Sequence, residues 1–143
     1  MIQPKLAALN AAYGQTLYEV FCEKEIIQLR VNVKNLALDN LLQQYQQTTW
    51  AFITASNPYS EPLSKQENQL RNEALAAELK PRYINLFSAV GRDESGDWLP
   101  EESLFVMGIN RADAMEIGKK YSQNTILYSE IGKPPELLWL FDE

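Results

Sequence analysis

The sequence contains no histidine and a single cysteine, Cys22, among its 143 residues. Without histidine the chain cannot build Ser-His-Asp or Cys-His catalytic groups, and it lacks the commonest general base near neutral pH and the usual zinc-enzyme ligands. One cysteine excludes an intrachain disulfide and a CxxC metal or redox motif. No Walker-type phosphate loop or GxGxxG motif occurs either. Catalysis would therefore depend on Asp, Glu, Lys, Tyr, Cys22 or a bound ion, and we expect no resident cofactor or metal.

Long apolar runs and clustered positive charge are also scarce. No segment approaches the roughly 20 apolar residues that a membrane-spanning helix needs, and no signal-peptide pattern precedes Lys5. The 13 basic residues are scattered among 19 acidic ones, which gives a net charge of −6. A nucleic-acid footprint needs clustered Lys and Arg. We therefore expect a cytoplasmic protein with no membrane and no nucleic-acid partner.

What is present predicts one α+β domain over residues 1–143. Hydrophobic residues make up 45% of the chain and charged residues 22%, a balance typical of soluble globular proteins. Helical and strand-like patterns mix hairpins with helical crossovers, so we expect a mixed sheet of about six strands with four helices packed on it. The expected helices lie near residues 6–13, 38–45, 65–79 and 110–121, and the expected strands near 16–21, 25–33, 50–55, 83–90, 103–109 and 125–131. The apolar segment 137–141 should add an edge strand or dock on the core.

A polar cluster follows the third expected strand. Thr54, Ser56 and Asn57 come at or directly after the end of the apolar run WAFITA, and Ser64 with Glu67 forms a capping box that starts the next helix. Polar groups that gather where a strand ends and a helix begins often form a ligand site. The same arrangement also makes an ordinary capped connection, so both interpretations stay open.

Two alternative faces of the helix over residues 65–79 decide whether this cluster extends along it. Asn68 and Asn72 share a stripe with Leu75 and Leu79. If those leucines face the sheet, the asparagines lie over the end of the preceding strand. A second apolar line that begins at Leu70 lies roughly 140° away around the helix. The sequence does not decide which line is buried.

Further candidates lie in the second half of the chain. Residues 91–97, GRDESGD, offer carboxylates for Ca²⁺ or Mg²⁺, but their spacing differs from the calcium-loop pattern and favours a hairpin turn. Trp98 is a candidate pocket wall and Glu101 a candidate general acid or base, or else Trp98 covers the core and Glu101 is solvated. Gln123 and Asn124 follow the last helix, where Asn commonly takes a left-handed C-cap conformation.

A series of motifs with consistent order and spacing runs from Trp50 to about Glu130. They are ITASNP at residues 53–58, Ser64, Glu67-Asn68, Leu79, Gly91, Trp98, Pro100-Glu101, the glycine of VMGI, and Tyr121 with Gln123-Asn124. In these motifs the chain resembles a bacterial family known only as domain of unknown function 3293. The family supplies no established activity, cofactor or catalytic residue. The resemblance therefore implies a compact bacterial domain and adds nothing about chemistry.

These features predict a non-catalytic binding or regulatory module for a polar small ligand or a protein partner. The candidate ligand-binding residues are Thr54, Ser56, Asn57, Ser64, Asn68, Asn72, Trp98, Gln123 and Asn124. The alternative is an enzyme for a small polar metabolite, with Glu101 as acid or base. A shared site requires Asn57, Asn68, Trp98 and Glu101 to converge on a concave pocket, with Glu101 partly desolvated. A protein-interaction module should instead expose an apolar patch, for example over residues 137–141.

Overall fold

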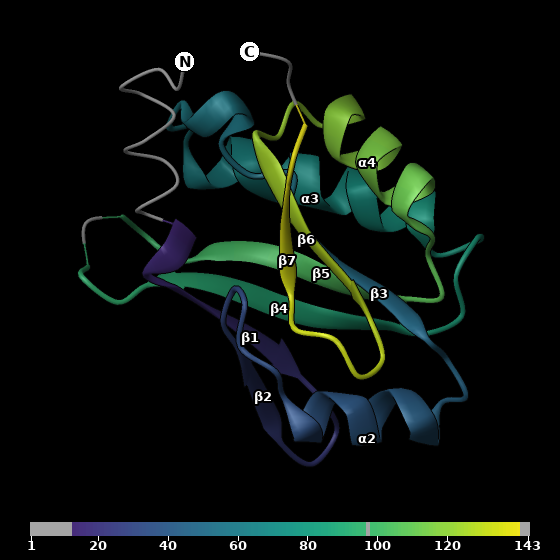
Figure 1. Ribbon diagram of the computed structural model, residues 1–143. Coiled ribbons are helices and arrows are strands. Elements are labelled where there is room, and N and C mark those ends of the chain that lie inside the picture. The colour runs from purple at the N-terminus through teal and green to yellow at the C-terminus, as the bar shows by residue number, and fades with distance from the viewer. Residues whose placement is uncertain (1–12, 97, 141–143) are drawn as a thin grey trace.

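One antiparallel sheet that curls into roughly half a barrel organises the protein (Figure 1). The computed structural model describes residues 13–96 and 98–140. The strand order across the sheet is β2-β1-β4-β5-β3-β6-β7, and every neighbouring pair is antiparallel. The strands are β1 (Thr16–Phe21), β2 (Ile26–Leu29), β3 (Thr49–Ile53), β4 (Leu86–Asp93), β5 (Glu101–Met107), β6 (Thr125–Glu130) and β7 (Glu136–Trp139).

The expectation of a mixed sheet of about six strands with four helices is wrong. The sheet has seven strands because residues 136–139 pair with β6 as an edge strand. It is antiparallel because β5 lies between β3 and β4, which run in the same direction but do not touch. The described residues contain three α-helices, α2 (Leu36–Gln44), α3 (Lys65–Leu79) and α4 (Arg111–Lys120). The helix expected over residues 6–13 lies, except for its last position, outside the described residues.

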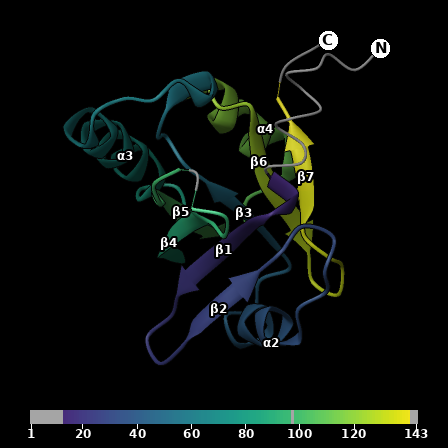
Figure 2. The same ribbon diagram turned by 90° about the vertical axis from the view of Figure 1, so that its left-hand side faces the viewer.

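The alternation of each strand gives the sheet two buried faces. In β3, Trp50 and Phe52 belong to the concave core, whereas Ala51 and Ile53 belong to the convex core. The rings of Tyr18 and Phe52 lie 5.0 Å apart although β4 and β5 separate their strands. Only a strongly curled sheet brings these strands into contact across its hollow side. The helices α3 and α4 cover the convex face, and α2 lies on the other side of the sheet (Figure 2).

The helix α3 buries the stripe that includes the asparagines. Asn72, Leu75 and Leu79 are buried, whereas Leu70 is 61% exposed, which resolves the two faces that the sequence left open. The predicted capping box is confirmed, since the Ser64 hydroxyl accepts from the Glu67 backbone N–H and the Glu67 carboxylate accepts from the Ser64 N–H. None of the helices in the described part of the chain is long and apolar enough to span a bilayer.

The two edges of the sheet, β2 and β7, approach each other without pairing as strands. Among the residues that the structure describes, one backbone hydrogen bond joins the loops beside them, from the Asn32 N–H to the Pro135 carbonyl oxygen at 2.8 Å. We call this contact the seam. Within the described residues the two edge strands are therefore not joined by a continuous ladder, and packing around α2 also links the two sides, as does a hydrogen bond from the Gly132 N–H to Asp39 Oδ1 at 2.9 Å.

Candidate ligand pocket

The side chains on the concave face change from apolar to polar along the strands. They run Val20-Tyr18-Thr16 on β1, Trp50-Phe52-Thr54 on and just beyond β3, and Met107-Phe105-Ser103-Glu101 on β5. The helix α2 packs on the apolar end through Leu38, Leu41 and Leu42. The helices α2, α3 and α4 leave the polar end open, and it forms a pocket that Tyr13 also lines.

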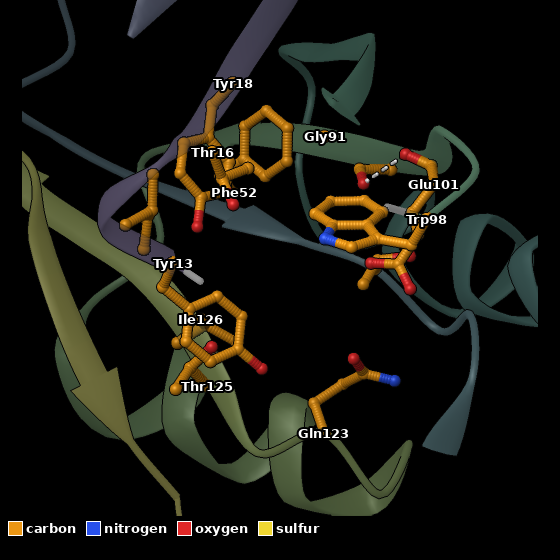
Figure 3. A pocket seen from close by; sticks show the side chains of 13 residues that line it. Tyr13, Thr16, Tyr18, Phe52, Gly91, Trp98, Glu101, Gln123, Thr125 and Ile126 are labelled. Carbon is orange, nitrogen blue, oxygen red and sulfur yellow. Dashed lines mark hydrogen bonds between the residues drawn. The ribbon is translucent and has the colours of Figure 1, made fainter. Parts of the chain in front are cut away.

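The pocket has about 450 Å³ of space not filled by protein, part of which opens to solvent. In Figure 3, Tyr13, Tyr18 and their neighbours form one wall, Trp98 and Glu101 form the opposite wall, and Gln123 lies at the base. Because the volume of about 450 Å³ includes space that is open to solvent, the enclosed part of the hollow is much smaller and suits a small chemical group.

Gly91 keeps part of the pocket floor open. It lies in β4, paired with Tyr18 on one side and Glu101 on the other. A Cβ atom at this position would meet only the Thr16 Cγ2 atom, at 4.0 Å, and the φ angle of Gly91 is not positive. Neither packing nor backbone conformation therefore requires glycine here, and the missing side chain adds to the volume of the pocket.

Glu101 places a partly buried carboxyl on the pocket wall. Burial raises the pKa of this carboxyl, and a hydrogen bond from Asn57 Nδ2 to Glu101 Oε2, at 2.8 Å, acts in the opposite direction. Glu101 forms no ion pair with a cation in the described part of the chain. Burial also raises the pKa of Tyr18, which keeps its proton near neutral pH.

The loop after β3 holds Asn57 in position behind Glu101. Asn57 has a left-handed φ of 47°, a conformation that Asn tolerates better than most residues. Its Oδ1 atom accepts from Asn68 Nδ2 at 2.8 Å and from the Leu63 N–H at 3.0 Å. Its own N–H donates to Asn68 Oδ1 at 2.8 Å. Asn57 therefore couples the start of α3 to the carboxyl of Glu101.

A second group of hydrogen bonds orients Gln123. Its Nε2 atom donates to the carbonyl oxygens of Ser56 and Tyr121, at 3.0 and 3.1 Å. Two carbonyl acceptors identify this atom as the nitrogen, so the side-chain oxygen faces the pocket (Figure 3). Asn72 holds the same loop from α3, since it accepts from the Ala55 N–H and donates to the Ser56 hydroxyl, both at 2.9 Å.

The structure brings several of the predicted site residues to one pocket. Thr54, Trp98, Glu101 and Gln123 line it. The remaining candidates, Ser56, Asn57, Ser64, Asn68, Asn72 and Asn124, do not line it. The convergence required for a shared site is met only in part. Trp98 and Glu101 line the pocket, whereas Asn57 lies behind Glu101, bonded to it and to Asn68. Ser64 caps α3, and Asn124 donates to the Ser60 hydroxyl at 2.8 Å.

The acidic segment before Trp98 forms a turn in its described part. The Asp93 carboxylate accepts from the backbone N–H and the hydroxyl of Ser95, at 3.1 and 2.7 Å. Among the residues described, no group of three or more His, Cys, Asp or Glu side chains could hold a metal ion. Asp97 lies outside the described residues.

Sequence reasoning missed most of the opposite wall. The pocket residues that it did not single out are Tyr13, Thr16, Tyr18, Phe52, Ser103, Thr125, Ile126 and Leu127, together with the role of Gly91. One signal was present in the sequence. In three strands the alternate positions that face inward change from apolar to polar residues toward one end of the strand. Recognising it requires the strand order, because β1 and β6 come together only through the curl of the sheet.

Comparison with known families now places the chain. A family model described as a protein of unknown function, DUF3293, matches residues 53–126, more than half of the sequence. The chain belongs to this family. The DUF3293 match contains Thr54, Gly91, Trp98, Glu101 and Gln123, whereas the wall formed by residues 13–18 lies outside it. No curated protein and no solved structure gives a significant match to the chain.

Proposed function

We propose that this DUF3293 protein is a binding or regulatory module that holds a small polar ligand in the pocket. The observation that carries the proposal is the Glu101 carboxyl, partly buried on an aromatic wall without a cationic partner among the described residues. A buried carboxyl without such a partner costs folding free energy. Groups of this kind are found preferentially at functional sites.

Backbone strain in the two loops beside the pocket also supports the proposal. Asn57, Tyr59 and Ser60 in one loop and Ser122 in the other have positive φ angles. The loops are joined by a hydrogen bond from the Tyr59 N–H to the Ser122 carbonyl oxygen at 2.7 Å. Each such residue costs on the order of 1–3 kcal/mol, and such strain clusters at binding sites. The strained loops carry Gln123 and the support for Glu101.

The segment expected to expose an apolar patch gives no support to a protein-interaction role. Leu138 and Leu140 are each only 6% exposed, because they pack in the convex core. Within the described residues, this segment is therefore part of the fold. A small ligand fits the observations better than a protein partner at this position.

A second candidate function is catalysis on a small polar metabolite. The raised pKa of Glu101 favours this alternative, because a general acid or base works best when its pKa lies near the operating pH. In that case Glu101 would exchange a proton with the bound molecule, while Trp98 and Gln123 position it. If the protein binds a ligand and leaves it chemically unchanged, the binding proposal is favoured over the enzyme.

A thermal-shift screen against small metabolites tests the proposal with two matched variants. Gly91→Val fills the pocket floor, whereas Ser88→Val adds the same side chain to an exposed position on the opposite face of β4. A ligand present at 100 times its Kd stabilises the native state by about 2.7 kcal/mol, a shift of several degrees. We expect hits to stabilise the wild type and Ser88→Val but not Gly91→Val.

Two results would overturn the binding proposal. One is that no compound stabilises the wild type, and the other is that every hit stabilises Gly91→Val equally. Each hit should then be incubated with the protein and followed by proton NMR. Conversion that is lost in Glu101→Gln would establish the enzyme alternative instead.

A further inference from the structure

We infer that the pocket takes a small organic cation whose primary ammonium group is held by Glu101 beside the aromatic rings of the two walls. This inference rests on the proposed binding function and names the chemical class of its ligand. It is supported by the charge of the lining residues, by their hydrogen-bonding capacity and by their aromatic faces.

The charge of the pocket favours a cation. Glu101 is the sole Asp, Glu, Lys or Arg among the described lining residues. The whole chain carries a net charge of −6, so the protein field does not attract anions either. A positively charged group would supply the partner that the Glu101 carboxylate lacks in the described structure.

The carboxylate has one oxygen left for such a group. Asn57 Nδ2 binds Oε2, and no described side chain or backbone N–H donates to Oε1. An ammonium at this oxygen would form a charge-assisted hydrogen bond, which is roughly twice as strong as a neutral one.

Three polar side chains of the lining, Thr54, Ser103 and Gln123, use their protons on the protein itself, although the Thr54 hydroxyl oxygen also accepts from the Ser56 N–H at 3.1 Å. The Ser103 hydroxyl donates to the Glu101 carbonyl oxygen at 3.1 Å, and the Thr54 hydroxyl donates to the Glu102 carbonyl oxygen at 2.6 Å. Gln123 directs its oxygen into the pocket, since its nitrogen binds two backbone carbonyls. A primary ammonium has three donors and no acceptor, so it matches this set.

The aromatic lining completes the match. Tyr13, Tyr18, Phe52 and Trp98 all line the pocket. A cation near the face of such a ring gains about 0.5–2 kcal/mol, with Trp the best partner. The cation–π contacts found in the described chain lie outside the pocket, Arg82 with Tyr83 and Arg111 with Tyr128. No arginine or lysine of the described chain takes the place of a ligand at these rings.

Three probes of one size separate charge from shape. They are n-propylammonium, n-propanol and propionate, which carry a positive charge, no charge and a negative charge. Titrations are followed by the indole N–H signal of Trp98 in two-dimensional NMR, assigned from its loss in Trp98→Phe. We expect saturable binding of propylammonium, at least tenfold weaker binding of propanol, and no binding of propionate. Tetramethylammonium, which has the charge but no N–H donors, should bind more weakly than propylammonium.

Variants separate failure of this inference from failure of the pocket. We expect Glu101→Gln to weaken propylammonium at least tenfold and to leave propanol unchanged. Gly91→Val should abolish binding of both, and Ser88→Val should change neither. If propanol or propionate binds as tightly as propylammonium and Gly91→Val removes it, the ammonium inference is wrong but the pocket function stands.

Two further outcomes decide the remaining cases. If propylammonium shows no saturable binding, the ammonium inference is overturned, and the metabolite screen decides separately whether the pocket binds anything. If it binds equally to wild type, Glu101→Gln and Gly91→Val, it binds outside the pocket. That result overturns the ammonium inference, and the metabolite screen again decides the pocket function. Nα-acetyl-lysinamide, as an additional probe, distinguishes a peptide lysine from a free amine, since only the peptide source predicts that it binds more tightly than propylammonium.

Discussion

The two ends of the concave face are built on the same strands and differ in what covers them. At the closed end, α2 packs Leu38, Leu41 and Leu42 against a core that includes Trp50 and Phe105, whose rings stack with centroids 5.2 Å apart. At the open end none of α2, α3 and α4 covers the strands, and polar side chains such as Thr54, Glu101 and Ser103 line the hollow together with apolar ones. Burial of apolar area stabilises the fold by about 25 cal/mol per Å². The closed end therefore supplies apolar burial that the open end, with its candidate pocket, does not.

The closed end has the better apolar packing, but the open end has the more complete hydrogen bonding. The indole N–H of Trp50, at the closed end, is buried without a partner among the described residues. At the open end, Asn57, Asn68 and Asn72 use their amide groups on one another and on the loop backbone. An apolar core tolerates one unsatisfied donor at a cost of about 1–3 kcal/mol. A polar site needs its supports fully bonded if they are to hold a carboxyl in place.

The largest expected effect is on the closed end. Leu42 is fully buried, so Leu42→Ala should lower the free energy of unfolding by about 2–5 kcal/mol through lost burial and a new cavity. Leu36→Ala in the same helix, at a residue 74% exposed, should change it by less than about 0.5 kcal/mol. Urea unfolding measures both. If ligand binding to the folded Leu42→Ala protein were lost, the two ends would not be independent.

The next effect is on the support of the open end. Asn57→Ala removes the hydrogen bond to Glu101 and leaves alanine with a left-handed φ, which should cost about 2–3 kcal/mol in unfolding experiments. Asn57→Gly removes the same side chain but accepts the backbone conformation. It should be more stable than Asn57→Ala by about 1 kcal/mol. Equal stabilities would show that the conformation at Asn57 carries no strain.

A smaller effect, of opposite sign, is expected at Glu101. Because its pKa in the folded protein is raised above the ordinary 4.5, Glu101 contributes stability that is fully present below pH 4.5 and is lost as pH rises through the folded pKa. Glu101→Gln keeps an acceptor for Asn57 and avoids this loss. We expect its Tm to exceed that of wild type at pH 7, as measured by thermal melting.

The pH dependence provides the control for Glu101→Gln. Below pH 4.5 both proteins carry a neutral group at this position, so the difference in Tm should disappear in melting curves recorded at pH 4. A difference that is constant from pH 4 to pH 7 would show that charge at Glu101 does not destabilise the fold.

The smallest effect on stability is expected for Gly91→Val. Valine favours strands more than glycine does, and a Cβ atom at position 91 has no contact closer than 4.0 Å. The free energy of unfolding should stay constant or rise by about 0.5–1 kcal/mol, while pocket binding is lost. A large destabilisation would mean that the space above Gly91 is needed for packing and not for a ligand.

Local sequence patterns predicted most helices and strands of this fold but not which strands lie next to each other in the sheet. The capping box of α3 and the alternation in β3 are encoded within a few residues, so both are legible in the sequence. The insertion of β5 between β3 and β4 depends on long-range pairing, which no local pattern specifies. The same limit applies to the pocket. Trp98 and Glu101 stood out, whereas Thr16 joins them only because the sheet curls.

The side chains of α3 show a second limit. Asn68 and Asn72 were predicted to bind a ligand, and the structure places both amides on the backbone or side chains of the loop after β3. Sequence alone does not distinguish an amide that faces a ligand from one that holds a loop. The ligand role of these residues stays a prediction, now with their hydrogen-bond partners known.

The seam between β2 and β7 has a mechanical consequence. Tyr18 and Leu127 line the same pocket from strands that lie on opposite flanks of the half-barrel. The edges of this sheet are not joined by a strand ladder, and the curvature of the sheet sets the distance between these flanks. A ligand that contacts both Tyr18 and Leu127 would hold the two flanks at a fixed distance. We then expect slower exchange of the Asn32 amide proton with solvent when the ligand is bound.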